Sequence, residues 1–296
     1  MIDRPELSKK ARDLFGDKIS SVWNYKNKVK SNLKRYDIFN VNHKVDMYRE
    51  RIPEEGKRGY DRTHDTFSQF NPDLCEAVYR IWAKKGDVVV DPFMGWGMRG
   101  VVAHLNGLNY IGYEISPTTI KEVKHTLNKV LETHFFSENT LTLNSILGDG
   151  TVLKESEDAS SDIIFTCPPY WKLEKYESIS NQLSDCPTYD NFMEFIDRCL
   201  FNCYRVLRND RYMVWVIGDF RIDGIYYPFH GDFISLALKQ KFILHDIIIR
   251  HYNNPFTNID PSQAYTKRRT SKEHEYIIVM RIGVDGGFLE KVDETA

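Results

Sequence analysis

The sequence has few cysteines and no long apolar run. Its 296 residues include five cysteines, and no two of them form a Cys-x-x-Cys pair, which argues against a structural zinc site and favours reduced thiols. No stretch approaches the roughly 18 apolar residues of a membrane-spanning helix, and residues 1–10 lack the apolar run of a signal peptide. We therefore expect a cytoplasmic protein with no membrane segment and no metal centre.

The chain does have enough apolar residues for a full core. Hydrophobic residues make up 42% and charged residues 28%, values that exclude disordered and fibrous proteins. The net charge of −2 hides an asymmetry, because residues 1–60 carry 15 Lys and Arg against 9 Asp and Glu. A basic arm on a mildly acidic body fits an anionic partner. A solvated, lysine-rich helical extension explains the charge equally well.

From residue 71 onward, short apolar runs alternate with helical patterns, as in a parallel sheet flanked by helices. The expected strands are residues 87–90, 110–113, 141–147, 162–166, 212–217, 242–249 and 276–280. The expected helices are residues 72–84, 97–106, 117–133, 189–207 and 231–239. A polar, basic loop joins the last two strands, which predicts a closing antiparallel hairpin. We expect an α/β domain with a doubly wound, mostly parallel seven-stranded sheet over residues 63–296, after a basic extension of helix and loop at residues 1–62.

The first motif follows the expected strand at residues 87–90 and precedes a helix. It reads Asp-Pro-Phe-Met-Gly-Trp-Gly at residues 91–97. Glycines at a strand-to-helix turn let the backbone approach a ligand at the carboxyl edge of a sheet. With Gly100 they also match the dinucleotide pattern Gly-x-Gly-x-x-Gly. The preceding Asp91 would repel a pyrophosphate, however, and suits a cationic amino-acid group.

Acidic residues follow the next two expected strands. Glu114 is placed to accept hydrogen bonds from both ribose hydroxyls of an adenosine ligand. Nicotinamide dinucleotides and S-adenosylmethionine both carry that ribose, so Glu114 does not choose between them. Asp149, between two glycines, is placed to meet the adenine amino group, although an ordinary Asp-Gly turn explains it equally well.

A pair of prolines decides the class of ligand. The expected strand at residues 162–166 runs into Cys-Pro-Pro-Tyr-Trp at residues 167–171. Consecutive prolines hold the chain extended and rigid, and the aromatic side chain after them offers a flat face at the sheet edge. Such a turn holds a planar base by stacking and directs backbone carbonyls at its exocyclic amine.

These motifs resemble those of S-adenosylmethionine-dependent DNA amino-methyltransferases. Residues 91–97 are similar to the family's Phe-x-Gly-x-Gly cofactor motif, and residues 166–171 to its catalytic (Asp/Asn/Ser)-Pro-Pro-aromatic motif. Residues 70–72 resemble its additional cofactor motif. The similarity extends over about residues 64–282, with the cofactor motif before the catalytic one.

The resemblance implies the class I methyltransferase fold, a Rossmann-like architecture. It also implies methylation of N4 of cytosine or N6 of adenine in a base flipped out of double-stranded DNA, with S-adenosylhomocysteine as the other product. The residues so assigned to the cofactor are Phe70, Asn71, Asp91, Phe93, Gly95, Gly97, Glu114, Asp149 and Thr166. The residues assigned to catalysis are Cys167, Pro168, Pro169 and Tyr170.

Cys167 departs from the family pattern, which has Asp, Asn or Ser at this position. A thiol is a weak hydrogen-bond acceptor, so the Pro168 carbonyl would hold more of the target amine. The sequence Thr-Cys-Pro-Pro-Tyr resembles the N4-cytosine subgroup, which has Ser here, and this favours cytosine slightly. The thiol also allows a rival mechanism, in which it attacks carbon 6 of a pyrimidine and methylation occurs at carbon 5.

Further residues near this edge are candidate DNA contacts. Trp171 follows the catalytic turn, and Asp219, after the strand at residues 212–217, either borders the substrate or caps a helix. Basic residues in the loop at residues 251–272 offer phosphate contacts or form a solvated loop. These basic residues are Lys267, Arg268, Arg269 and Lys272.

Three other classes compete with a DNA methyltransferase. An RNA or tRNA amino-methyltransferase shares both motif types. The intact motifs argue against a nucleic-acid-binding protein with an inactive site, and a dehydrogenase leaves residues 168–170 unexplained. The sequence therefore predicts a DNA-modifying methyltransferase of the restriction-modification kind. It leaves the recognition sequence, the oligomeric state and the existence of a cognate nuclease open.

Overall fold

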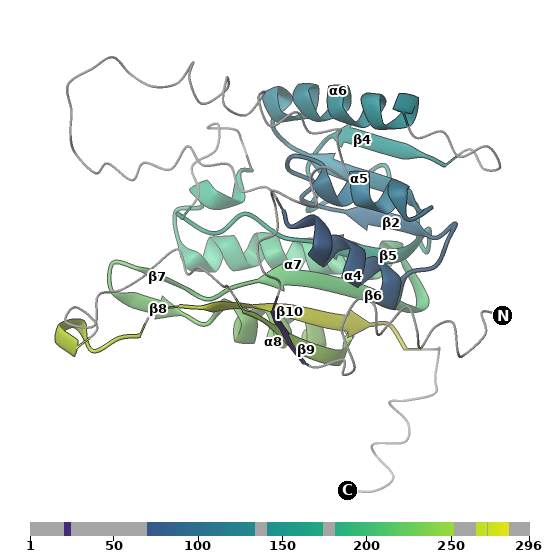
Figure 1. The fold of residues 1–296 in the computed structure, drawn as a ribbon. Coiled ribbons are helices and arrows are strands. Elements are labelled where there is room, and N and C mark those ends of the chain that lie inside the picture. Colours follow the sequence, from purple (N-terminus) through teal and green to yellow (C-terminus); the bar gives the residue numbers. More distant parts are fainter. Residues whose placement is uncertain are drawn as a thin grey trace, which may run out of the picture.

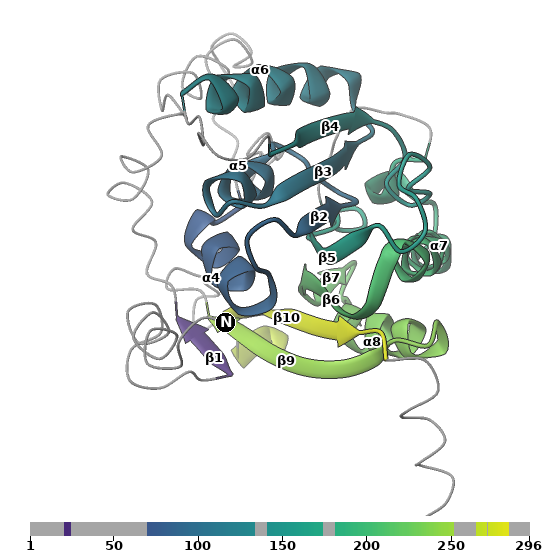
Figure 2. The same cartoon turned by 90° about the vertical axis from the view of Figure 1, so that its right-hand side faces the viewer.

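The computed structural model describes residues 21–24, 70–133, 141–173, 181–251, 265–270 and 272–283. Within them the chain forms an eight-stranded sheet in the order β1-β9-β10-β6-β5-β2-β3-β4, with helices on both faces (Figures 1 and 2). Most of the extension at residues 1–62 lies outside the described residues. The architecture is the class I, Rossmann-like α/β fold that the sequence predicted.

Five neighbouring strands of the sheet are parallel. They are β2 (Val88–Asp91), β3 (Asn109–Glu114), β4 (Leu143–Leu147), β5 (Ser161–Thr166) and β6 (Leu207–Ile217). The chain then forms β9 (Ile243–His251) and β10 (His274–Arg281). Strand β10 lies between β6 and β9 and is antiparallel to both, which confirms the closing hairpin.

Amphipathic helices cover the two faces of the sheet (Figure 2). One face carries α4 (Pro72–Trp82), α5 (Met98–Leu105) and α6 (Pro117–Thr133), and the other carries α7 (Tyr189–Val206) and α8 (Phe229–Lys239). Helix α4 begins where the Asn71 side chain accepts a hydrogen bond from the Leu74 N–H at 3.1 Å, with proline at the first helical position. Every residue of the central strand β5 is buried, as expected for a strand covered on both faces.

The N-terminal extension contributes a strand that the sequence did not predict. Strand β1 (Val22–Asn24) pairs in parallel with β9, so the expectation of helix and loop throughout residues 1–62 is wrong at these three residues. Burial of an aromatic side chain explains the pairing. Trp23 is 5% exposed and stacks on Trp82 of α4 with ring centroids 6.1 Å apart. Three residues are too few to show a strand period in the sequence.

A second pair of strands follows β6 directly. Strands β7 (Phe220–Ile222) and β8 (Ile225–Tyr227) form a separate two-stranded hairpin. This hairpin was not predicted, although an Asp-Gly pair between short apolar segments is a strong hairpin signal.

Gly150, just after β4, lets two loops meet at the carboxyl edge of the sheet. A Cβ at this position would lie 1.7 Å from the carbonyl oxygen of Pro92, in the loop after β2. No side chain fits at that distance, so the backbone of one loop packs against the backbone of the other.

We predict that Gly150→Ala lowers the free energy of unfolding by at least about 2 kcal/mol, because the new methyl group overlaps a backbone oxygen. Gly231→Ala is the matched control. Gly231 lies in α8 with no described atom within 4 Å of an added Cβ, and alanine there should stabilise by up to about 1 kcal/mol. Urea denaturation measures both. Equal stability of the two variants would contradict the close approach at Gly150.

Candidate active site

Residues far apart in the sequence meet at the carboxyl edge of the parallel strands. Asp91 ends β2, Glu114 ends β3, and Thr166 ends β5. Since the strands are parallel and adjacent in the order β5-β2-β3-β4, the loops that follow them emerge side by side. This is the edge at which ligands bind in open α/β sheets.

The carboxylate of Asp91 is fully buried and joins these loops. Arg99 Nε and the Tyr110 hydroxyl donate to its Oδ2 at 2.7 and 2.6 Å. The Thr166 hydroxyl and the Phe93 N–H donate to its Oδ1 at 2.7 and 3.2 Å. Asp91 and Thr166 have no exposed surface, so neither side chain is open to a ligand in this structure. Burial of both side chains argues against the direct cofactor contact that the sequence predicted. Their hydrogen bonds instead position the loop after β2 next to the end of β5.

Arg99 is the buried cation that balances Asp91, and no sequence motif indicated it. Its Nη2 donates to the Phe93 carbonyl, and its guanidinium lies 4.7 Å from the centre of the Phe70 ring. Burial lowers the pKa of Arg99, but the adjacent Asp91 more than reverses this and holds it above its ordinary value. The pair is tolerated in the core because both charges are hydrogen-bonded. It fixes Phe70 beside the loop that follows β2.

The glycine loop at residues 92–97 has an open side. Gly95 and Gly97 have positive φ angles of 53° and 77°, and the Met94 N–H ties the loop to β3 by donating to the Tyr113 carbonyl at 2.8 Å. A Cβ on Gly95 would meet no described atom within 4 Å. A Cβ on Gly97 would lie 2.9 Å from a methyl group of Val123. Gly95 therefore leaves room for a ligand, whereas Gly97 is also needed for helix packing.

Gly100 has a packing role that separates this loop from a dinucleotide site. A Cβ at Gly100 would lie 2.7 Å from the Tyr110 ring, so the glycine allows α5 to pack closely on β3. Its presence in a Gly-x-Gly-x-x-Gly pattern is thus explained by packing alone.

Glu114 lies beside the glycine loop, as the sequence predicted. One carboxylate oxygen accepts a hydrogen bond from the Ser116 N–H at 2.8 Å. Burial raises the pKa of Glu114 above its usual value, and the N–H groups of Ser116, Ile115 and Gly95 oppose that rise. A half-buried carboxylate next to an open backbone position fits the ribose of an adenosine ligand.

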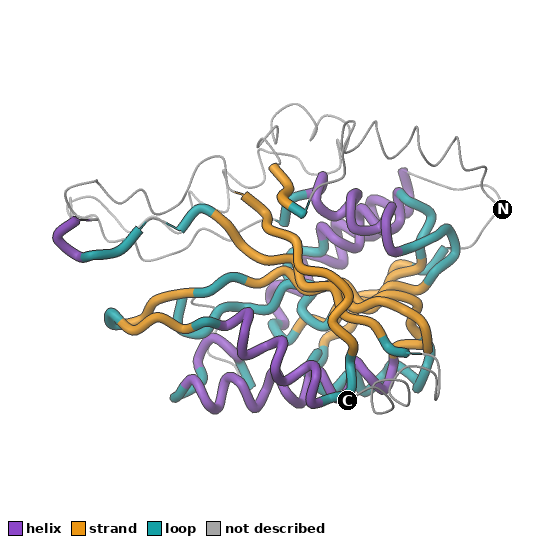
Figure 3. Tube along the Cα trace, turned by 90° about the horizontal axis from the view of Figure 1, so that it is seen from below, coloured by secondary structure: helices purple, strands orange, loops and turns teal. Residues whose placement is uncertain are grey.

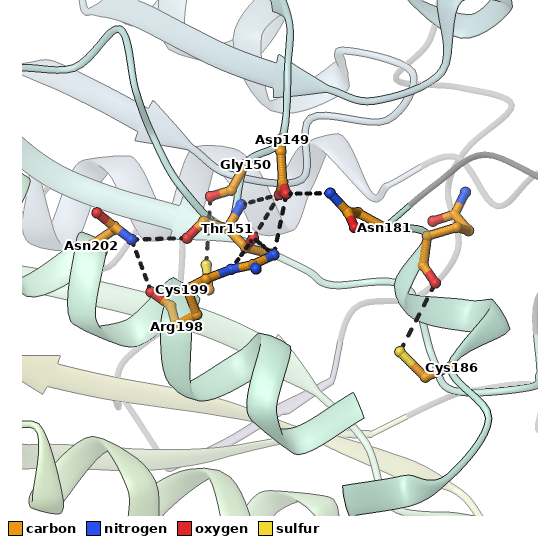
Figure 4. A network of polar contacts seen from close by, with 9 residues as sticks. Asp149, Gly150, Thr151, Asn181, Cys186, Arg198, Cys199 and Asn202 are labelled. Carbon is orange, nitrogen blue, oxygen red and sulfur yellow. Dashed lines mark hydrogen bonds and ion pairs between the residues drawn. The ribbon is translucent and has the colours of Figure 1, made fainter. Parts of the chain in front are cut away.

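Asp149 belongs to a polar network between the loop after β4 and helix α7 (Figure 4). Its Oδ1 accepts hydrogen bonds from the N–H and the hydroxyl of Thr151 at 2.9 and 2.6 Å. Its Oδ2 is 3.3 Å from Asn181 Nδ2 and 3.2 Å from Arg198 Nη2. Both oxygens are engaged, so the structure favours the Asp-Gly turn over a contact with an adenine amino group.

The turn at residues 167–170, for which the sequence predicts a catalytic role and which we therefore call the catalytic turn, leaves β5 directly beside the glycine loop. The Phe93 N–H donates to the Thr166 hydroxyl at 3.2 Å, and Cys167, which follows, is half-buried. Pro168 is buried, whereas Pro169 and Tyr170 are half-buried. The two motifs of the sequence analysis therefore share one site.

Trp171 anchors the turn from within the protein. It is 4% exposed, and its indole N–H donates to the Cys186 carbonyl at 2.7 Å. Its ring packs against Tyr227 of β8, with centroids 5.1 Å apart. The expected DNA contact is wrong for this buried side chain, which is needed to hold the turn in place.

Asp219 is a cap. It is 4% exposed, and its carboxylate accepts hydrogen bonds from the Tyr226 hydroxyl at 2.6 Å and from the N–H of His230 in the first turn of α8 at 3.1 Å. Burial opposes ionisation, but Tyr226 and His230 hold the pKa of Asp219 below its usual value. Of the two predicted roles, the structure shows the capping one.

The basic residues before β10 differ in burial: three lie at the surface, whereas the amine of Lys272 is buried. Lys272 Nζ has no exposed surface and no hydrogen-bond partner among the described residues. A Cβ on Gly218 would lie 3.5 Å from this nitrogen and 3.2 Å from the Tyr170 hydroxyl, so Lys272 reaches the catalytic turn. The exposed or half-exposed members of the cluster are Lys267, Arg268 and Arg269.

None of the five cysteines, all of which lie in the described residues, forms a disulfide. Four are buried, and Cys167 is the partly exposed one. In the part of the chain that the structure describes, no group of three or more His, Cys, Asp or Glu side chains is arranged to hold a metal ion. None of the described helices is both long and apolar enough to cross a membrane.

A comparison with protein families matches two long segments of the chain. Residues 3–125 and 161–284 match the N6_N4_Mtase model, whose description is DNA methylase. The match begins far upstream of residue 64 and so includes much of the N-terminal extension. The expectation that the resemblance starts near residue 64 is therefore wrong.

Individual proteins are similar over parts of the chain. The orphan methyltransferase M.BamHII of Bacillus amyloliquefaciens is 32% identical over 118 residues, which are 36% of this chain and 44% of that protein. The chain thus spans less than half the length of this curated relative. The (4+2)-cyclase SpnF has a TM-score of 0.50 at 14% identity, covering 72% of this chain and 82% of that one. A SAM-dependent methyltransferase from Methanosarcina mazei has a TM-score of 0.49 at 11% identity, covering 70% and 98%.

The family match extends over most of the chain and includes both motifs of the site. The cyclase supports the fold alone. From the family match we conclude that the chain belongs to the N6_N4_Mtase family of DNA methylases.

Proposed function

We propose that this protein transfers the methyl group of S-adenosylmethionine to an exocyclic amine of a base in double-stranded DNA. The observation that carries the proposal is the hydrogen bond from Phe93 of the glycine loop to Thr166, the residue before Cys-Pro-Pro-Tyr. A methyl donor held by the first motif and an amine held by the second then lie within reach of each other. Membership in a DNA methylase family supports the same class of reaction.

The cofactor supplies an activated methyl group on a sulfonium. On this chain Glu114 holds the ribose hydroxyls, and the open side of Gly95 admits the ligand next to the backbone. Asp149 shapes the adenine end through its turn. The residues that shape the methionine end are Phe70, Asn71, Phe93 and Gly97, held in place by Asp91 and Thr166.

The catalytic turn holds the target base. Tyr170 stacks on the flipped base, and the Pro168 carbonyl accepts a hydrogen bond from the exocyclic amine, which directs the nitrogen lone pair toward the methyl group. Pro169 keeps this backbone extended. The nitrogen gains the methyl group, loses a proton to solvent, and S-adenosylhomocysteine is left. Cys167 in the place of serine favours N4 of cytosine over N6 of adenine.

Flipping a base costs a few kcal/mol, and phosphate contacts offset this cost. Lys267 and Arg268 are exposed on the loop before β10, where they suit contacts with the DNA backbone. An RNA substrate and carbon-5 methylation by Cys167 are the competing outcomes that the experiments below distinguish.

Glu114→Ala should weaken S-adenosylmethionine binding at least tenfold, because hydrogen bonds to a charged acceptor are worth about 1.5–3 kcal/mol. Glu132→Ala is the control, since Glu132 is an exposed carboxylate near the end of α6 and should leave the affinity unchanged. Isothermal titration calorimetry measures both. An unchanged affinity in Glu114→Ala would remove Glu114 from the cofactor site.

Cys167→Ser distinguishes the two chemistries. Direct transfer to an amine should survive this change within about tenfold, or about 1.4 kcal/mol of barrier, because a serine hydroxyl accepts a hydrogen bond from the amine at least as well as a thiol. Covalent attack by the thiol would be abolished. Tyr170→Ala should lose nearly all turnover, since stacking contributes about 1–3 kcal/mol per base, whereas Tyr170→Phe retains the ring and should stay active. Tritium transfer to DNA measures all three. An inactive Cys167→Ser that still binds cofactor and DNA would favour carbon-5 methylation.

Lys272 is a buried amine near Tyr170. Its role is to bind the substrate, and it does not stabilise the fold. Burial lowers the pKa of Lys272 to about 8, although the carboxylates of Asp219 and Glu275 act in the opposite direction. Those carboxylates already bond to other partners, Asp219 to Tyr226 and Glu275 to Arg250. An exposed lysine in the unfolded chain has a pKa near 10.4. Between pH 8 and about 10.4, Lys272 is protonated in the unfolded chain and neutral in the folded one. In this range the free energy of unfolding therefore rises with pH. At pH 7 the ammonium destabilises the fold.

We therefore predict that Lys272→Met raises the melting temperature at pH 7 while lowering the affinity for DNA. The gain in melting temperature should shrink as the pH rises from 8 to about 10.4. Lys267→Met, an exposed cation on the same loop, should lower DNA affinity without changing the melting temperature. Scanning fluorimetry and fluorescence anisotropy measure these effects. A Lys272→Met protein that melts lower than wild type would show that the amine stabilises the fold.

A further inference from the structure

The β7–β8 hairpin projects from the catalytic edge of the sheet. Two residues separate it from the end of β6, and its strands pair with Phe220 opposite Tyr227 and Ile222 opposite Ile225. Asp223 and Gly224 at the tip have positive φ angles of 50° and 84°, the turn geometry that matches the twist of two paired strands. Figures 1 and 3 show the hairpin extending beyond the body of the molecule.

The base of this hairpin is fixed to the catalytic turn. Phe220 and Tyr227 stack with centroids 5.6 Å apart, and the Phe220 ring also meets the Tyr170 ring at 6.1 Å. The hydroxyl of Tyr226 donates to the buried Asp219 at 2.6 Å. An isolated two-stranded hairpin is marginally stable in water, so these contacts are what hold it in one orientation.

The tip of the hairpin, by contrast, is exposed: Asp223 and Gly224 form the turn, and the aliphatic side chain of Ile225 follows them directly. Ile225 is 59% exposed, although Tyr227, two residues further on, packs against the rings of Phe220 and Trp171. The strand is therefore built to present an aliphatic side chain outward from an anchored base.

The hairpin carries one cation and one anion, Arg221 in β7 and the exposed Asp223 at the turn. Arg221 lies on the hairpin, with its guanidinium 4.8 Å from the centre of the Tyr226 ring, and its side chain is exposed. The short helical segment with Lys267 projects from the same end of the molecule in two views (Figures 1 and 3). An exposed aliphatic side chain with an arginine on the same hairpin fits a nucleic-acid duplex, whose backbone is anionic and whose stacked bases are apolar.

We propose that the β7–β8 hairpin enters the base stack of DNA and that Ile225 fills the space left by the flipped base. This inference rests on the proposed function. Proteins insert apolar side chains as wedges between base steps, and a side chain in the space of the flipped base replaces part of the stacking that this base loses. Because the base of the hairpin touches Tyr170, the wedge and the ring that receives the base are held in one fixed arrangement.

The test compares fully paired DNA with DNA that is mismatched at the target base. The target is first mapped from the DNA that the wild-type protein methylates. A mismatched base is already cheaper to flip, so a wedge matters less there. Ile225→Ser should lower the methylation rate on paired DNA at least tenfold and on mismatched DNA less than threefold. Ile225→Leu, which retains an aliphatic side chain, should stay within threefold of wild type on both.

Leu238→Ser is the matched control, because Leu238 is 49% exposed near the end of α8 and should retain the wild-type rate on both substrates. Melting temperatures and cofactor affinities of all variants should equal those of wild type. Equal losses for Ile225→Ser on the two substrates, or no loss on either, would overturn the wedge and leave the proposed function intact. A wild-type protein that methylates neither substrate would overturn the proposed function and the wedge together.

Discussion

The buried carboxylate of Asp91 is the interaction on which the site depends. It accepts hydrogen bonds from Arg99 in α5, Tyr110 in β3 and Thr166 at the end of β5. Three separate segments therefore meet at one charge, and the ion pair with Arg99 keeps that charge compensated in the core. The glycine loop and the catalytic turn are held together through Asp91, so the spacing of the two motifs is a consequence of packing. A second anchor, the aromatic cluster around Trp171 and Phe220, connects the catalytic turn to the hairpin beside it.

The arrangement of the fold could be predicted because apolar runs and helical periods alternate clearly from residue 71 onward. All seven predicted strands exist, and the differences are confined to their ends, as with β6, which begins at Leu207. Two elements were missed for physical reasons. Strand β1 depends on Trp23 packing against Trp82, a contact between distant segments that no local pattern shows. The β7–β8 hairpin is too short for periodicity, and its Asp-Gly turn was the available signal.

The positions of the site residues were easier to predict than their roles. Motifs placed Asp91, Glu114 and Thr166 at one edge, since the ends of adjacent parallel strands must meet there. Whether a carboxylate faces a ligand or the core depends on its partners, and Arg99 is a partner that no motif names. The role of Asp219 was equally hard to predict from the sequence. Its carboxylate accepts a hydrogen bond from the N–H of His230 and so caps α8, which no local pattern shows.

The central claim is that the chain methylates an exocyclic amine in DNA. The most direct measurement incubates the purified protein and S-adenosylmethionine with duplex DNA, and separately with RNA of the same sequence, followed by mass spectrometry of the released nucleosides. We expect N4-methylcytosine, or else N6-methyladenine, in DNA and no methylation of RNA. Methyl groups found at carbon 5 of cytosine, or only in RNA, would contradict it.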